Sequence, residues 1–83
     1  MIIHTTNTIE GMKIVKNFGY IEAKPSALSW DPRKSARKHL EKKAEELGAN
    51  AIINFKTQDP LGVGIGAFAS GNAVIVEEMN KKI

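Results

Sequence analysis

The chain contains no cysteine and few aromatic residues, with one tryptophan, one tyrosine and three phenylalanines among its 83 residues. Without cysteine it cannot form disulfides or thiolate metal clusters. A chain this short buries only ~60–65% of the surface of its unfolded state, and small domains compensate with disulfides, a structural metal or oligomerisation. The remaining ways to stabilise this fold are a compact core, self-association, or a metal held by histidine and carboxylate ligands.

Long hydrophobic runs are also missing, because no apolar stretch approaches the ~18 residues of a membrane span. The N-terminal segment turns polar after Ile3 and lacks the basic and apolar regions of a signal peptide. We therefore expect a cytoplasmic protein with no membrane partner, folded as one domain over residues 1–83. The net charge of +3 mainly serves solubility.

The clearest predicted element is a helix over residues 31–47. Asp31 is a good N-cap, Pro32 a good first helical residue, and Gly48 fits the left-handed position that follows a helix. Apolar residues recur at helical spacing and form one narrow stripe, Ala36, Leu40, Ala44 and Leu47. Because half of this stripe is alanine, the helix can pack closely against a sheet.

Two strands are predicted before the helix, over residues 2–6 and 12–24. The second contains Asn17 and Gly19, which are poor strand formers, so we expect a bulge or bend near them.

Two more strands are predicted after the helix, the first over residues 49–58. A segment that alternates with glycine follows, and Ser70 and Gly71 interrupt it. Residues 72–78 then complete the fourth strand.

The order strand, strand, helix, strand, strand predicts an α+β domain in which one main helix covers one face of a small antiparallel sheet. The large apolar strand residues exceed what the helix stripe can cover: Phe18, Tyr20, Ile53, Phe55 and Ile75. A second subunit is the simplest cover for the opposite face.

Four short motifs, in order along nearly the whole chain, resemble the YbjQ family, whose members are described as heavy-metal-binding. They are TTNTIEGMKI at 5–14, FGYI at 18–21, LGANAI at 47–52 and ASGNAV at 69–74. Asn72 stands where the family more often has threonine. The resemblance implies a dodecin-like subunit fold and a ring assembly, with a pentamer expected, but it implies no activity. The segment before the helix, residues 25–30, is shorter than in typical members, so a function located there is in doubt for this chain.

The helix places Arg33, Lys34 and Arg37 at its positive end, against the preference of the helix dipole. A solvated helix face explains such a charge run, but so does an anion site. With Trp30 beside them, these residues are the predicted site for a phosphate or carboxylate.

A metal site would need ligands from several segments, and His4, Glu10 and Glu22 are its candidates. Soft metals prefer cysteine, which is absent, so an ordinary structural role for the histidine is the competing interpretation.

The glycine run lacks the following helix that a phosphate-binding loop requires, so it is interpreted as a close subunit contact. The predicted assembly contact comprises Gly62, Gly64, Gly66 and Phe68.

Catalysis has no recognisable residue pattern here, so the chain is predicted not to be an enzyme. The favoured function is a non-enzymatic homo-oligomeric module that binds a small anion or other ligand between subunits, or acts as a scaffold, with its cofactor unknown. Metal binding is the alternative, and a nucleic-acid accessory role is a further one that the short basic patch favours least.

Overall fold

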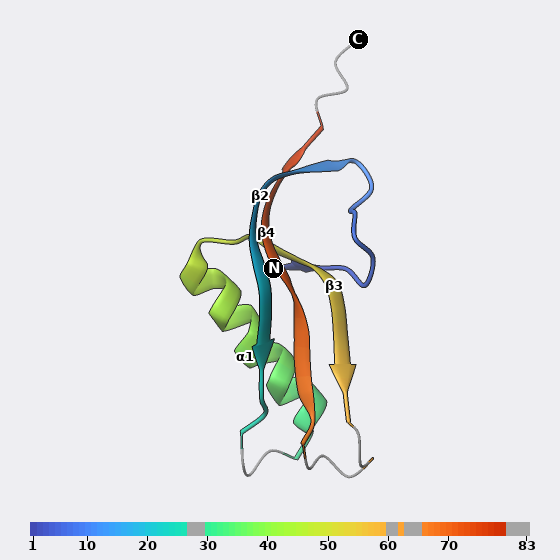
Figure 1. The fold of residues 1–83 in the computed structure, drawn as a ribbon, viewed down its shortest axis with the longest axis vertical. Coiled ribbons are helices and arrows are strands. Elements are labelled where there is room, and N and C mark those ends of the chain that lie inside the picture. Colours follow the sequence, from blue (N-terminus) through green and yellow to red (C-terminus); the bar gives the residue numbers. More distant parts are fainter. Residues whose placement is uncertain (27–29, 60–61, 63–65, 80–83) are drawn as a thin grey trace.

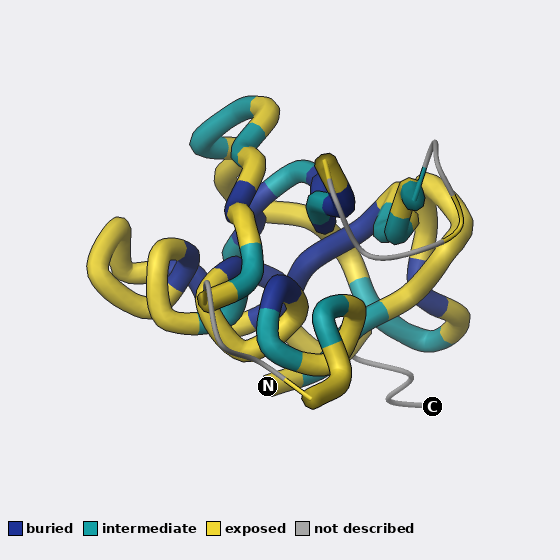
Figure 2. Tube along the Cα trace, turned by 90° about the horizontal axis from the view of Figure 1, so that it is seen from below, coloured by how far each residue is buried: buried dark blue, intermediate teal, exposed yellow. Residues whose placement is uncertain are grey.

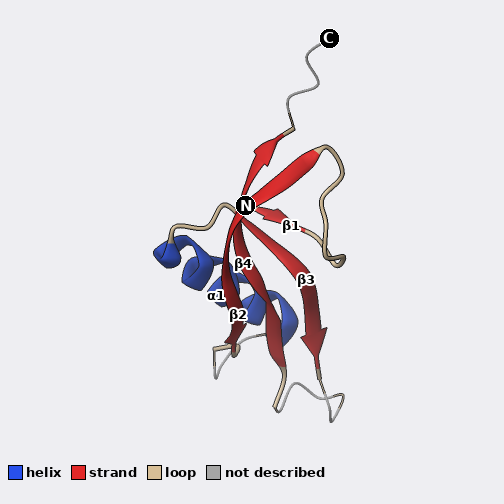
Figure 3. Ribbon diagram, turned by 45° about the horizontal axis from the view of Figure 1, so that its top comes forward, coloured by secondary structure: helices blue, strands red, loops and turns tan. Residues whose placement is uncertain are grey.

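The structure is a computed structural model, and it describes residues 1–26, 30–59, 62 and 66–79. Its elements in chain order are β1 (Ile2–Ile3), β2 (Met12–Ala23), α1 (Pro32–Leu47), β3 (Ala51–Gln58) and β4 (Phe68–Glu78). The strands form one sheet in the order β1-β3-β4-β2, and α1 lies across one face of it (Figures 1 and 3). The predicted α+β fold with one main helix is confirmed. The sheet is mixed, because β1 pairs in parallel with β3 while the other pairings are antiparallel.

Helix α1 begins and ends as its sequence predicts. The Asp31 carboxylate accepts a hydrogen bond from the backbone N–H of Lys34 at 3.2 Å, and Pro32 occupies the first turn. Gly48 adopts φ 95°, a left-handed conformation that glycine enters without a Cβ penalty, and its N–H bonds to the Glu45 carbonyl at 3.0 Å. These two caps account for the predicted bounds of 31–47.

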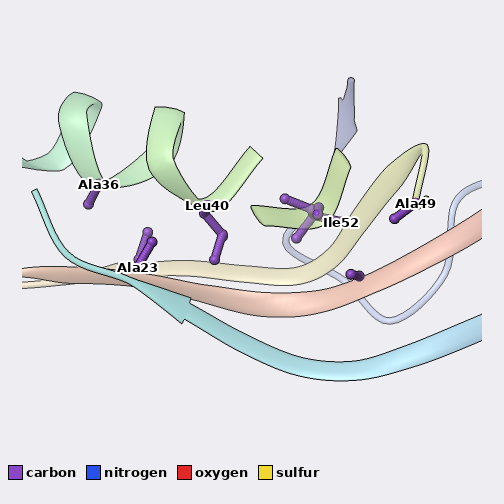
Figure 4. Packing of buried hydrophobic residues seen from close by; sticks show 8 residues of the cluster. Ala23, Ala36, Leu40, Ala49 and Ile52 are labelled. Carbon is purple, nitrogen blue, oxygen red and sulfur yellow. The ribbon is translucent and has the colours of Figure 1, made fainter. Parts of the chain in front are cut away.

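The main core lies between α1 and the sheet (Figure 4). From the helix side Ala36, Leu40 and Ala44 are buried, and from the central strand β4 the facing residues are Ala69 and Ala73. Small residues on both sides allow α1 to approach the middle of the sheet closely, as the alanine-rich stripe predicts. Figure 2 shows this buried layer inside a largely exposed outer surface.

A second, smaller cluster is formed by Ile9, Ala51, Ile53, Val74 and Val76. These residues alternate along β3 and β4 with those of the main core, so they occupy the face of the sheet opposite α1. Ile9, from the connection between β1 and β2, is part of this cluster. The chain therefore covers part of this face itself.

The structure divides the large apolar strand residues between the two faces of the sheet. Phe18 and Phe55 pack against the main core on the helix side, and Ile53 is only 3% exposed in the second cluster. Tyr20 is the member of the predicted set that is widely exposed, at 61%. The strand register, which shifts in both β2 and β3, decides which of these residues face α1.

The expected irregularity in β2 is confirmed, since the pairing of β2 with β4 shifts between Ile14 and Lys16 and again between Asn17 and Gly19. The predicted interruption at Ser70 and Gly71 is wrong, because β4 runs without a break from Phe68 to Glu78. A Cβ at Gly71 would lie 2.5 Å from Cγ2 of Ile52. This glycine therefore permits close packing inside the strand and does not end it.

In the described part of the chain, no helix is long and apolar enough to cross a membrane.

Candidate functional site

A groove lies between the N-terminal half of α1 and strand β3, with a volume of about 620 Å³. It is lined by the cations Arg33, Lys34, Arg37 and Lys38 and by the carboxylates of Asp31 and Glu41. Phe55 and Thr57 contribute its β3 side. We call this feature the basic groove. Three of the four residues predicted for an anion site, Arg33, Lys34 and Arg37, line it together.

Arg37 is the best-positioned cation of the basic groove. Its guanidinium carbon lies 5.7 Å from the centroid of the Phe55 ring, within the range of a cation–π contact. Its Nε lies 4.0 Å from a carboxylate oxygen of Glu41, one turn further along α1. Phe55 and Glu41 thus orient the planar guanidinium of Arg37. The Arg37 side chain is still 52% exposed, so this group is open to solvent.

The start of α1 offers fewer backbone donors than the sequence suggests. Pro32 has no N–H, the Lys34 N–H bonds to the Asp31 carboxylate, and the Ser35 N–H bonds to the Asp31 carbonyl at 3.0 Å. An anion in the basic groove would therefore be held mainly by side-chain cations. A good N-cap and an anion compete for the same N–H groups, so the cap at Asp31 leaves fewer of them for an anion.

Trp30 does not line the basic groove. It borders a neighbouring shallow groove of about 420 Å³, whose lining includes Lys34, Lys38 and His39. The Trp30 side chain is fully exposed, at 102%. The structure thus places the predicted aromatic residue beside the cations and separates it from Arg33 and Arg37.

His39 and Ser26 connect the end of β2 to α1. The Nδ1 of His39 lies 2.7 Å from the Lys24 carbonyl, so Nδ1 carries the proton in this contact. Ser26 approaches Nε2 of His39 at 3.4 Å, and its backbone N–H bonds to the Ser35 hydroxyl at 2.9 Å. These bonds explain His39 as a structural residue.

The predicted metal ligands are not brought together within one chain. Across the described residues, no three histidine or carboxylate side chains gather closely enough to hold a metal ion. His4 follows β1, Glu10 precedes β2, and Glu22 lies near the far end of β2, where its carboxylate accepts a hydrogen bond from the Tyr20 hydroxyl at 2.6 Å. A site built from these three residues would need ligands from a second copy, and it stays a prediction.

The predicted assembly contact is described only in part. Gly64 lies outside the described residues, and Gly62 and Gly66 are exposed with positive φ. Phe68 begins β4 and lines a larger groove of about 970 Å³ between the end of β2 and the C-terminal half of α1. We call this the apolar groove. Its other apolar or aromatic lining residues are Tyr20, Ile21, Ala23 and Leu47.

A polar group that the sequence does not predict lies on the face of the sheet opposite α1 and consists of Tyr20, Glu22 and Ser70. The hydrogen bond to the Glu22 carboxylate raises the pKa of Tyr20, because the charged acceptor favours the protonated hydroxyl. The side-chain contact with Ser70, which is buried, lowers this pKa, but the bond to Glu22 has the larger effect. The alternation of Tyr20 and Glu22 along one strand was the available signal, but their partner comes from β4.

No family profile matches the chain. A UPF0145 protein of Methanocaldococcus jannaschii is 33% identical over 91 aligned positions, which cover 96% of this chain and 97% of that protein.

Proposed function

We propose that this chain, which belongs to the UPF0145 family, is a non-enzymatic homo-oligomeric module that binds a small anion in the basic groove. UPF0145 is the YbjQ-like family that the four sequence motifs resemble. The heavy-metal binding attached to that family stays a prediction for this chain, as does its expected pentameric ring.

The observation that carries this proposal is the charge of the basic groove. Four cations and two carboxylates line it, which leaves a formal excess of two positive charges in one small volume. A groove of this size is in the range of small-ligand sites, which are typically ~300–1,000 Å³. Arg37 presents a planar fork of donors that matches the geometry of phosphate or carboxylate. The ligand class is therefore a small phosphate or carboxylate anion.

The oligomeric part of the proposal is supported by exposed apolar side chains. Substantially exposed apolar side chains among the described residues are those of Ile14, Val15, Trp30, Leu47 and Met79. Single exposed apolar residues are ordinary on a monomer. A fully exposed tryptophan together with an open apolar groove in a domain of this size favours self-association.

Thermal unfolding with pyrophosphate tests the anion site. At ten times its dissociation constant, a ligand of the native state stabilises it by about 1.4 kcal/mol. For a domain of this length that is a rise in Tm of roughly 6–11 °C. We expect this rise in Tm with pyrophosphate and a much smaller one with sodium chloride at equal ionic strength. Both salts screen the surface charges of the protein to the same extent, so screening does not explain a difference between them.

Two matched variants locate the binding. Arg37→Gln removes a cation inside the basic groove, and Lys42→Gln removes one from the same helix outside it. We expect Arg37→Gln to lose most of the pyrophosphate-induced rise and Lys42→Gln to keep it. Equal losses in both variants, or an equal rise with sodium chloride, would show that the anion acts only through overall charge.

A further inference from the structure

The single tryptophan of the chain is fully exposed at one end of α1. Trp30 precedes the first residue of α1 by two positions, and its side chain is 102% exposed. Tryptophan carries one of the largest apolar surfaces of any residue, and at protein surfaces it is enriched where it inserts into a partner. This residue has the character of a docking group.

The apolar groove lies towards the other end of the same helix. Lys43, Glu46 and Leu47 form its helix side, and residues of β2 form its strand side. Leu47 is 44% exposed, so apolar surface at this groove is open to solvent. The bond from Nζ of Lys43 to the Glu22 carbonyl, 2.7 Å long, holds a backbone acceptor on the edge strand β2. This bond hinders pairing of another strand there and leaves the groove to side-chain insertion.

Trp30 does not line the apolar groove of its own chain, and its side chain is fully exposed. Lys43, on the helix side of that groove, lies 13 positions further along the chain, about 20 Å at 1.5 Å per residue of helix. A second copy can bring the two features together. Such a contact joins different surfaces of the two copies, and contacts of this kind build closed rings or filaments.

The charges at the two ends of α1 favour this contact. The first turn contains Arg33 and Lys34 and no acidic residue, whereas the last turn contains Glu45 and Glu46 and no basic residue. The helix dipole adds positive charge at the first end and negative charge at the second. One copy therefore presents a basic end with an exposed tryptophan, and the next presents an acidic end beside an apolar groove.

We propose that Trp30 of one copy docks head to tail in the apolar groove of a second copy, beside Leu47. This inference rests on the homo-oligomer of the proposed function and names its interface. The contact places Lys34, shared by the Trp30 groove and the basic groove, next to the subunit boundary. An anion bound in the basic groove then lies close to two subunits.

The fluorescence of Trp30 tests this contact directly, because the chain has no other tryptophan. We expect its emission to lie at short wavelength in the assembled protein and to move to longer wavelength on dilution, in step with the mass measured by light scattering. Trp30→Ala should raise the apparent dissociation constant of the assembly by about 30-fold or more, which is the effect of losing an interface hot spot. Trp30→Phe, which keeps an aromatic side chain, should raise this dissociation constant less.

A mixing experiment tests the partner surface. Leu47→Gln damages the apolar groove but keeps Trp30, and Trp30→Ala keeps the groove but contributes no tryptophan emission. Adding Trp30→Ala protein to Leu47→Gln protein should shift the emission of the latter to shorter wavelength, because its Trp30 now finds an intact groove. Val15→Gln, at an exposed apolar residue outside both features, is the matched control and should leave assembly unchanged.

The outcomes separate this inference from the proposed function. An oligomer in which Trp30 emits as in water, or which Val15→Gln disrupts and Leu47→Gln does not, overturns the head-to-tail contact and leaves the oligomer standing. A folded monomer at all concentrations refutes the oligomer itself. Anion binding by the monomer would still be measured by the pyrophosphate titration.

Discussion

Gly71 is the residue whose replacement should most clearly expose the packing of the sheet. A Cβ added there would lie 2.5 Å from Cγ2 of Ile52 and 2.9 Å from the carbonyl oxygen of Ile53. Ile52 is fully buried in the main core, and β3 pairs with β4 on both sides of the contact. Neither neighbour can move away without disturbing the core or the pairing of these strands.

The expected size of the effect follows from two opposing contributions. The φ angle of Gly71 lies outside the left-handed region, so alanine would fit the backbone and would gain ~0.5–1 kcal/mol from its lower entropy in the unfolded state. Overpacking of a tight core costs about 1–3 kcal/mol, and a contact with backbone belongs at the upper end of that range. We therefore expect Gly71→Ala to lower the free energy of unfolding by about 2 kcal/mol, which is roughly 8–16 °C in Tm.

Thermal or urea unfolding at one fixed protein concentration measures this loss, because self-association would otherwise shift Tm. Gly11→Ala is an informative control, since Gly11 has φ 79° and open space around it, so its cost of ~1–2 kcal/mol comes from the backbone alone. Ile52→Leu removes the β-branch at a similar volume and should recover part of the loss when combined with Gly71→Ala. If Gly71→Ala is as stable as the parent, or if Ile52→Leu recovers nothing, the steric reasoning is wrong.

Two further predictions concern other parts of the molecule. The Asn50 side chain bonds to both the N–H and the carbonyl of Val76, at 2.8 and 3.0 Å, so Asn50→Ala should lose about 1–3 kcal/mol in urea unfolding. A change below a few tenths of a kcal/mol would show that water replaces both bonds. The hydrogen bond to Glu22 raises the pKa of Tyr20, so the only tyrosine should ionise above its ordinary value of 10.0 in an absorbance titration. Glu22→Ala should move that midpoint down, and an unchanged midpoint would exclude this cause.

The helix could be predicted fully because its signals are local. Asp31, Pro32 and Gly48 each act within one turn of their own position, so no knowledge of the rest of the fold is needed. The motif LGANAI at 47–52 also has a structural explanation, since Gly48 caps α1 and Asn50 joins the chain to β4. Its part in the family resemblance therefore has a basis in the fold.

The faces of the strands could not be predicted in the same way. Register shifts in β2 and β3 reverse which side chains meet the helix, and Asn54 adopts a positive φ of 54° at the shift in β3. A one-residue shift moves every later side chain to the other face. For the same reason Ser70 and Gly71 were mistaken for a strand end, because the close approach of Ile52 depends on the pairing of β3 with β4.

The sequence predicted the cations of the anion site but not the other residues that line it. Arg33, Lys34 and Arg37 share one helix, so their proximity follows from helical spacing alone. Phe55 and Thr57 enter the basic groove from β3, some 20 residues away along the chain, and no local pattern connects them to α1. The separation of Trp30 from Arg37 likewise depends on where the chain turns into the helix.

The reversed charge order of α1 is unfavourable within a single chain. Each cation in the first turn and each carboxylate in the last costs ~0.3–1 kcal/mol at low salt, and an i,i+4 pair such as Arg37 with Glu41 returns only ~0.2–0.5 kcal/mol. Stability of the monomer therefore does not account for this order. An anion in the basic groove would offset the charge at one end of α1, and the basic end of a neighbouring copy would offset the charge at the other. High salt should weaken both compensations, because both depend on charge. Since they act at opposite ends of α1, Arg37→Gln should remove the anion site and leave the contact at Leu47.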